Sequence, residues 1–302
     1  MTQLQKYTWL IDTIRRAGKI SHKDLSEKWQ RAKELSDCNP LPRATFNRWR
    51  DRIFDQFGII IECQRAGGYL YYIENPDDID EDKLRKWMLD SFAVGNLIGE
   101  NLVLKNRILV GSIPSGSIHL KTMLDAMKDS LAVAITHRPF RHSHGYSFTI
   151  EPYCVKLFEN RWYVLGKNNR GEIRLYGLDR IEEARILENR FVLPPDFNAK
   201  DFFAPYYGII TGDDVPPQRI VLRANETHKY YINSLPIHES QTLLEDCDDH
   251  ADFELFLAPT YDFVMKLLQF GSMIEVISPE SLRKTMKSRI SEMSELYRND
   301  LP

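Results

Sequence analysis

The sequence predicts an α+β protein built from several domains, and three observations support this prediction. With 302 residues, 43% hydrophobic and 27% charged, the chain can bury more than one core. Apolar residues repeat at helical spacing before residue 58 and alternate, as in strands, after it. The acidic, strongly breaking stretch Asn75-Pro76-Asp77-Asp78 then separates this first block from the rest of the chain.

The first two helices are predicted from an apolar stripe and a capping residue. Gly18 ends the first helix, and the stripe of that helix consists of Leu4, Tyr7, Trp9, Leu10, Ile11 and Ile14. Ser21 stands at the N-cap position of the second helix, with Asp24 three residues later as in a capping box. Leu25 and Trp29 face inward along this second helix.

A third helix begins near Arg43 and ends at Gly58. At about 100° per residue, its buried side comprises Phe46, Trp49, Ile53 and Phe57. The opposite side comprises Ala44, Asn47, Arg48, Asp51 and Arg52, with Arg43 and Thr45 at its N-terminal edge. Two strands, 59–63 and 69–73, follow around the turn Arg65-Ala66-Gly67-Gly68 and form a hairpin.

Three helices followed by a hairpin are, in this order, the winged helix-turn-helix arrangement of DNA-binding proteins. Its third helix enters the major groove, where arginine can bind guanine and asparagine can bind adenine. The candidate base contacts are Arg43, Thr45, Asn47 and Arg48, and the candidate phosphate contacts are Arg52 and Arg65. Residues 1–73 hold 13 Lys and Arg against 8 Asp and Glu, whereas the remainder holds 27 against 35. The basic end is therefore the predicted site for double-stranded DNA.

An alternative is a small helical protein-interaction domain that exposes the same arginines. Asp51 and Asp55 on the exposed side argue against insertion of the whole helix into a groove. We therefore expect only the first two turns of the third helix to approach DNA.

Residues 76–117 are predicted to form a helical linker, because Leu84, Trp87, Met88 and Phe92 repeat at helical spacing without strand alternation. Such a stripe can pair two subunits or pack into an ordinary core. A further helix is expected over 118–130. After it, short apolar or alternating blocks broken by glycines predict a small, strongly bent β-barrel or sheet.

One block of this β-rich region resembles a known family. Trp162-Tyr163-Val164 is preceded by Glu151-Pro152-Tyr153 and followed by Arg174, Tyr176 and Leu178-Asp179-Arg180-Ile181. The block resembles the WYL domain of bacterial transcriptional regulators. In that family a winged helix-turn-helix precedes an Sm-like or SH3-like β-barrel, and a C-terminal extension follows. The resemblance implies a regulator whose barrel senses an effector, either a nucleotide or a nucleic-acid fragment.

The ligand-binding residues that the resemblance implies are His137, which stands where a tyrosine is common, Tyr163, Arg174, Tyr176 and Arg180. Phe148 stands where many members have an arginine, a departure from the family's usual phosphate binding. Strand alternation puts Trp162 and Val164 on one packing face and Tyr163 on the other. An aromatic ring beside Arg174 would suit a base and its phosphate.

The last part of the chain predicts the element order βαββαβ followed by a helix, which is a ferredoxin-like sandwich. Its acidic run 245–252 is most simply a solvated hairpin loop. The resemblance implies that this extension contacts a partner subunit. The predicted domains are a winged helix-turn-helix over 1–75, a helical linker over 76–117, a WYL β-barrel sensor over 118–200 and the extension over 215–302.

These features favour a cytoplasmic, homodimeric, DNA-binding transcriptional regulator with a ligand-sensing barrel. We expect no enzymatic activity and no catalytic residue, because P-loop, G-x-S-x-G and zinc-deaminase motifs are absent from the sequence. The alternative is an accessory to a nucleic-acid-processing enzyme, or a protein-interaction adaptor without sequence-specific DNA binding.

No metal, cofactor or membrane span is expected either. The four cysteines lie far apart without a C-x-x-C pair, which suggests reduced thiols. His142 and His144 lack a Glu or Cys ligand at a convincing spacing, so a solvated basic loop is the better interpretation. No apolar run reaches the roughly 18 residues needed to cross a bilayer, and the N-terminus lacks a signal-peptide cleavage site.

Overall fold

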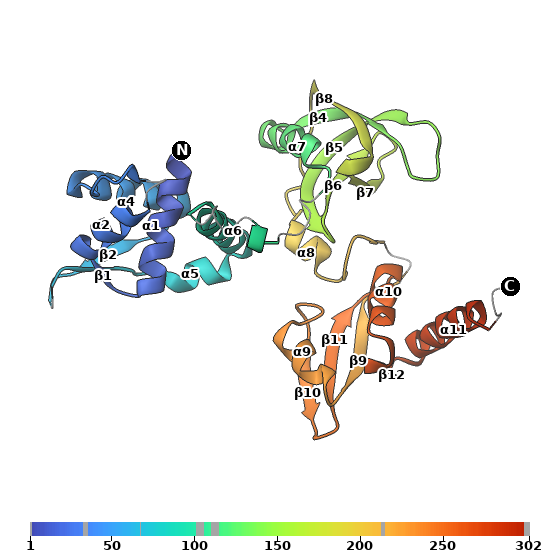
Figure 1. Cartoon of the computed structure of the whole chain (residues 1–302). Helices are drawn as coiled ribbons and strands as arrows, with labels where there is room; N and C mark the ends of the chain where they lie inside the picture. Colours follow the sequence, from blue (N-terminus) through green and yellow to red (C-terminus); the bar gives the residue numbers. More distant parts are fainter. Residues whose placement is uncertain are drawn as a thin grey trace. The chain divides into compact units, whose positions relative to one another are not determined.

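The chain folds into two compact units, Met1–Gly111 and Ser112–Pro302. Both are drawn in Figure 1. The computed structural model describes residues 2–32, 36–66, 68–100, 106–109, 115–212 and 215–298. Mixed helices and antiparallel sheets make it an α+β protein, as predicted. None of the helices in these ranges combines the length and the hydropathy needed to span a bilayer.

The predicted caps define the first helices of unit one. Helix α1 (Gln3–Ala17) ends at Gly18, whose φ of 67° suits a residue without a Cβ. Helix α2 (His22–Arg31) begins at Ser21, whose Oγ accepts a hydrogen bond from the Asp24 amide at 3.1 Å. This side-chain bond satisfies one of the amides that a helix start leaves without a partner.

Helix α4 (Arg43–Phe57) buries the predicted face. Phe46 and Ile53 are fully buried, and Trp49 and Phe57 nearly so. Three tryptophans join the helices, because the Trp29 ring lies edge-on to Trp9 at 5.0 Å and to Trp49 at 5.1 Å. Edge-to-face packing of this kind is favoured by the charge distribution of aromatic rings.

The predicted hairpin is part of a three-stranded sheet. Strands β2 (Ile61–Gln64) and β3 (Leu70–Ile73) pair as expected, but β3 also pairs with β1 (Ile20–Ser21), giving the order β1-β3-β2. Ile20 lies opposite Tyr71 in this ladder. Gly67, in the predicted turn, lies outside the described residues.

Part of the predicted linker over 76–117 belongs to unit one. Helices α5 (Pro76–Glu81) and α6 (Lys83–Glu100) follow the hairpin, and α6 packs on α1, where Arg15 pairs with Asp90 at 2.9 Å. Leu89 is the buried residue of α6 in the core of the unit, whereas Leu84 and Trp87 from the predicted stripe are 67% and 51% exposed. Most of the expected continuation beyond α6 lies outside the described residues.

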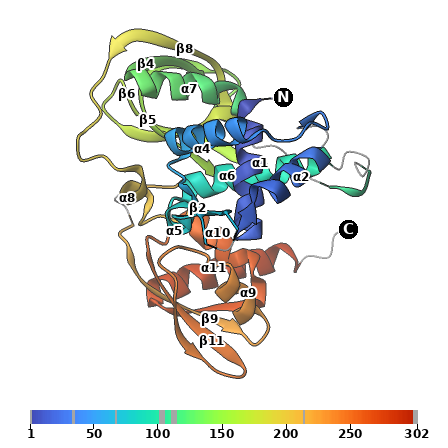
Figure 2. The ribbon, with the colours of Figure 1, turned by 90° about the vertical axis from the view of Figure 1, so that its left-hand side faces the viewer.

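Unit two begins with α7 (Ser117–Asp129) and a five-stranded antiparallel sheet of order β7-β6-β5-β4-β8. Helix α7 lies across this sheet, as Figures 1 and 2 show from two directions. The strands are β4 (Leu131–His137), β5 (Tyr146–Phe158), β6 (Arg161–Asn168), β7 (Ile173–Gly177) and β8 (Ile181–Arg190). Their shared core under α7 includes Met123, Ala126, Ile135, Ile150 and Val164.

The closed barrel expected for this region is not observed. Strands β7 and β8 form the two edges of the sheet, and no ladder joins them within the described residues. A short 3₁₀ turn, η2 (Leu178–Arg180), connects them, and its Leu178 is fully buried in the core.

A connecting segment with the short helix α8 (Ala199–Phe203) leads to the last part of unit two. The element order there is the predicted βαββαβ followed by a helix, and the sheet order is β10-β11-β9-β12. The elements are β9 (Gln218–Asn225), α9 (His228–Ser234), β10 (Thr242–Asp246), β11 (His250–Leu257), α10 (Tyr261–Gln269), β12 (Ile274–Ser278) and α11 (Glu280–Leu296).

Candidate nucleic-acid interface and sensor groove

The exposed face of α4 brings most of the predicted DNA contacts together. Arg43, Asn47 and Arg48 are exposed, and their spacing puts them on one side of the first two turns. Thr45 is half-buried and therefore presents less of its side chain. No ion pair joins Arg48 to any residue within the described ranges. Its guanidinium is thus available to an anion or a base edge.

Arg52 and Arg65 have different surroundings. Arg52 is exposed one turn further along α4, with Nη1 3.8 Å from an oxygen of Asp55. Arg65 is exposed where β2 ends, near the tip of the hairpin. Because the Arg52 pair is exposed to solvent, it contributes little stability and costs little to break.

The hairpin holds two arginines of α4 in place. Arg43 Nη2 donates a hydrogen bond to the Tyr71 hydroxyl on β3 at 3.5 Å, and this bond raises the pKa of Arg43. The Arg50 guanidinium lies 5.6 Å from the centre of the same tyrosine ring. Arg50 was missed by the sequence analysis, although it lies on the same helix as the predicted contacts.

A hollow of about 610 Å³ lies between the start of α2, the start of α4 and the tip of the hairpin. It is lined by Ser21, His22, Lys23, Ser26, Glu27, Arg43, Gly68 and Tyr69. Burial, followed by the nearby charge of Arg43, lowers the pKa of His22. His22 is therefore neutral at pH 7, and Lys23 and Arg43 are the cations of this hollow.

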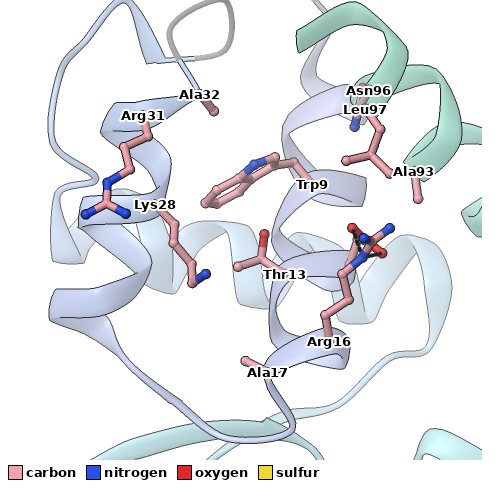
Figure 3. Close-up of a pocket in the computed structure, with 11 residues that line it drawn as sticks. Trp9, Thr13, Arg16, Ala17, Lys28, Arg31, Ala32, Ala93, Asn96 and Leu97 are labelled. Carbon is pink, nitrogen blue, oxygen red and sulfur yellow. Dashed lines mark hydrogen bonds and ion pairs between the residues drawn. The ribbon is translucent and has the colours of Figure 1, made fainter. Parts of the chain in front are cut away.

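A second hollow of unit one, about 370 Å³, lies between α1, α2 and α6 (Figure 3). The Trp9 indole lies in the middle of the residues drawn, with the Lys28 and Arg31 side chains to one side of it. The charge of Arg16 is paired with Asp12 at 2.8 Å. None of the predicted DNA contacts lines this hollow.

In unit two, a groove of about 630 Å³ contains two of the predicted ligand residues, Arg174 and Tyr176. Its aromatic lining is continuous, because Phe148 stacks on Tyr146 at 5.4 Å and lies 5.2 Å from Tyr176. Two nitrogens of Arg174 donate to Glu172 at 3.1 and 3.2 Å, and this contact lowers the pKa of the Glu172 carboxyl. The groove thus offers ring faces, the pre-paired cation of Arg174 and a second arginine, Arg170, in its lining.

His137 is buried against the rings of this groove. Its imidazole lies 5.5 Å from Tyr176, 5.9 Å from Tyr146 and 6.5 Å from Phe148. Neither ring nitrogen has a hydrogen-bond partner among the described residues. Burial, with a smaller contribution from Arg180, lowers the pKa of His137 and keeps it neutral at pH 7. A buried polar ring without a partner is costly and marks an unusual position.

Tyr163 and Arg180 do not line the groove. Tyr163 is only 6% exposed, so its ring presents little surface on which a base could stack. Burial also raises the pKa of Tyr163. The Arg180 and Arg161 guanidinium groups each lie 5.4 Å from the ring centre of Phe140, which is 72% exposed. The five predicted ligand residues therefore belong to two separate places, and Phe140 and Arg161 were missed.

Comparison with known families agrees with this architecture. Residues 118–186, which comprise α7 and most of the five-stranded sheet, match the family model of the WYL domain. The chain carries a WYL domain. Residues 216–294 match the WCX domain, which accounts for the second, four-stranded sheet and its helices. This WYL-WCX protein matches no curated protein sequence.

Solved structures similar to the WYL-WCX protein include two chains of low sequence identity. Proteasome accessory factor B/C (PafBC) of Arthrobacter aurescens is 15% identical, with a TM-score of 0.39, and the match covers 99% of this chain and 48% of that one. The chain thus spans about half the length of PafBC. A CRISPR Cas-related protein is 10% identical, with a TM-score of 0.42, covering 98% of this chain and 87% of the other.

Proposed function

We propose that the WYL-WCX protein is a DNA-binding transcriptional regulator whose WYL domain senses a nucleotide or nucleic-acid ligand. The observation that carries this proposal is the exposed face of α4, where Arg43, Asn47 and Arg48 lie beside a three-stranded hairpin sheet. Among the described residues, the order α1-β1-α2-α4-β2-β3 suits a winged helix-turn-helix. The protein would act by binding, without catalysis.

Base contact would fall to the first two turns of α4. An arginine without an ion pair can donate two hydrogen bonds to guanine, and an asparagine can bind adenine in the same way. Arg48 and Asn47 are adjacent and exposed, which suits this role. Asp51 and Asp55 are exposed further along the helix and would repel phosphates there.

Ligand sensing would use the aromatic groove of the WYL domain. A base can stack on the Tyr146 and Phe148 rings, which are already nearly parallel to each other at 21°. A phosphate would have to compete with Glu172 for Arg174. Arg170 also lines the groove, forms no ion pair among the described residues and could meet that phosphate.

A homodimer would place two copies of α4 on neighbouring half-sites. Two-fold related helices of this type read half-sites about 34 Å apart or a multiple of that distance. Leu84 and Trp87 on α6 expose apolar surface that a second copy can cover. The half-site spacing measured in footprints would report this arrangement.

The decisive experiment isolates genomic fragments bound by the purified full chain and then measures affinity for one of them against salt. If Arg52 and Arg65 of both protomers of a dimer meet phosphates, the logarithm of the binding constant should fall with a slope of about −3.6 against log salt. The Arg48→Ala variant should lose affinity for the selected site. The Arg289→Ala variant, which removes a charge from α11, is the matched control.

Enrichment of no fragment, or equal affinity of the Arg48→Ala and Arg289→Ala variants, would contradict the proposal. If the purified chain instead retains proteins and not DNA, and does so independently of salt, the result would favour the protein-interaction adaptor.

A further inference from the structure

Three potential metal ligands of unlike chemistry meet on one hairpin of the WCX domain. A sulfur of Cys247, a carboxylate oxygen of Glu245 and a ring nitrogen of His250 all lie within 4.8 Å of one another. They form the one group of three such ligands found among the described residues. Glu245 is exposed, whereas Cys247 and His250 are half-buried.

The geometry of the β10–β11 hairpin explains this meeting. Glu245 and Cys247 are two residues apart in an extended segment, so their side chains project to the same face. The Cys247 amide donates to the His250 carbonyl oxygen at 2.8 Å, which pairs these two residues across the turn Asp248-Asp249. Side chains directly opposite each other in a hairpin also share a face.

Contacts around the three residues hold this arrangement. An oxygen of Asp249 lies 2.7 Å from Nδ1 of His250, which leaves Nε2 of that ring for another partner. The Lys229 ammonium donates to Asp246 at 2.7 Å and also to the Cys247 carbonyl oxygen, so the strand end is tied to α9. Protein ligands of metals are commonly oriented in this way, with a carboxylate on the second histidine nitrogen.

Two cations beside this hairpin, Lys229 and Arg223, are each paired with a carboxylate and so oppose a bound metal less strongly. Arg223 lies on β9 and forms two hydrogen bonds of 2.8 Å with Asp252, the residue opposite Glu245 in the ladder. The charge of Arg223 is therefore neutralised, and Asp252 is occupied. Exposed Asp248 and Asp249 add negative charge at the turn.

We propose that Glu245, Cys247 and His250 bind a transition-metal ion of the zinc type, with a fourth position left to water or another ligand. A thiolate, an imidazole and a carboxylate suit zinc or cobalt and not magnesium or calcium, which prefer oxygen alone. Tetrahedral bonds of about 2.0–2.3 Å put ligand atoms roughly 3.3–3.8 Å apart. Small rotations of the three side chains would bring their ligand atoms to that spacing.

Binding requires the Cys247 thiol to lose its proton to solvent as the sulfur–metal bond forms. In the metal-free chain, burial and a hydrogen bond with Glu245 raise the pKa of Cys247. Metal uptake should therefore release a proton and weaken as the pH falls.

The test is a titration of the full chain, stripped with chelator under reducing conditions, with Co²⁺ alone. The expected result is a saturable visible absorption of tetrahedral cobalt together with a near-ultraviolet thiolate-to-cobalt band at one ion per chain. Cys247→Ser should remove the thiolate band, and His250→Ala should abolish the visible band or shift it to the weak absorption of six-coordinate cobalt. Asp249→Asn should weaken affinity about 10- to 100-fold.

Cys38→Ser is the matched control, because it removes an exposed thiol from unit one and should leave both bands unchanged. Circular dichroism of each variant distinguishes the loss of a metal-ligating side chain from the loss of the folded structure. If Cys247→Ser does not fold, His250→Ala still tests the proposal. The absence of both bands at excess Co²⁺, or bands that persist in Cys247→Ser and His250→Ala, would overturn the proposal.

Discussion

Lys156 on β5 is a buried cation whose replacement should stabilise unit two. Its ammonium donates to the Gly208 carbonyl oxygen at 2.6 Å and lies 4.0 Å from the Phe203 ring centre, so it joins the WYL sheet to the connecting segment. Burial lowers the pKa of Lys156 to about 8, against a smaller opposing effect of Asp262. Lys156→Met keeps the length of the side chain and removes the charge.

The pKa shift sets the expected size of the effect. A fall from 10.5 to about 8 means that burial of the charged form costs about 3 kcal/mol. Loss of the hydrogen bond to Gly208 destabilises the variant by about 1 kcal/mol and offsets part of this gain. We therefore expect Lys156→Met to be more stable than the wild type by about 2 kcal/mol at pH 7.

The sign of the pH dependence follows from the same shift. Between pH 8 and 10.5 the unfolded chain keeps the Lys156 proton and the folded chain does not. Wild-type stability should therefore rise with pH relative to Lys156→Met, by at most about 1.4 kcal/mol per pH unit. The buried tyrosines that also titrate in this range are common to both proteins and cancel in the difference, whereas the Cys154 thiol interacts electrostatically with Lys156 and contributes to it.

Urea unfolding of both proteins at pH 7.5, 8.5 and 9.5 measures this difference, with the Lys167→Met variant, which removes a lysine of the neighbouring strand β6, as the control. A difference between wild type and Lys156→Met that does not change with pH would refute the reasoning, as would a variant less stable at pH 7.

Three further predictions concern a turn, a cap and the groove. Gly116→Ala would place a Cβ 2.7 Å from the Leu178 Cβ at a φ of 84° and should cost about 2–4 kcal/mol by urea unfolding, whereas Gly171→Ala has open space and should cost about 1 kcal/mol. Ser21→Ala should lower the stability of unit one by about 0.5–2 kcal/mol, measured by its thermal unfolding. Arg174→Ala should leave DNA affinity unchanged in gel shifts but reduce the effect of added nucleotide, and a loss of folding would mean that this exposed ion pair is structural.

Much of the fold could be predicted because short-range patterns decide it. The buried face of α4, the cap at Ser21 and the element order after residue 215 depend on neighbouring residues, and all are observed. Strand β1 has only two residues, too few to produce a period in the sequence. Its pairing with β3 depends on a contact between segments about fifty residues apart, which local patterns cannot reveal.

The candidate sites were predicted less completely for the same reason. Alternation put Tyr163 opposite Trp162 and Val164, but β6 is an inner strand and four successive residues from Tyr163 are buried, so both of its faces are covered. The uninterrupted apolar run from Tyr163 indicates a strand buried on both faces, and an interpretation based on alternation alone does not take it into account. Glu245, Cys247 and His250 show no standard metal spacing, and only the register of their hairpin brings them together.

The ladder between β1 and β3 also has a mechanical consequence. Ile20 and Ser21 pair with Tyr71 and Leu70, and Ser21 is at the same time the cap of α2. A hairpin paired with β1 in this way cannot move independently of the start of α2. Any displacement of the hairpin would pull on the start of α2 through the main-chain hydrogen bonds of the ladder, so hairpin and helix would move together.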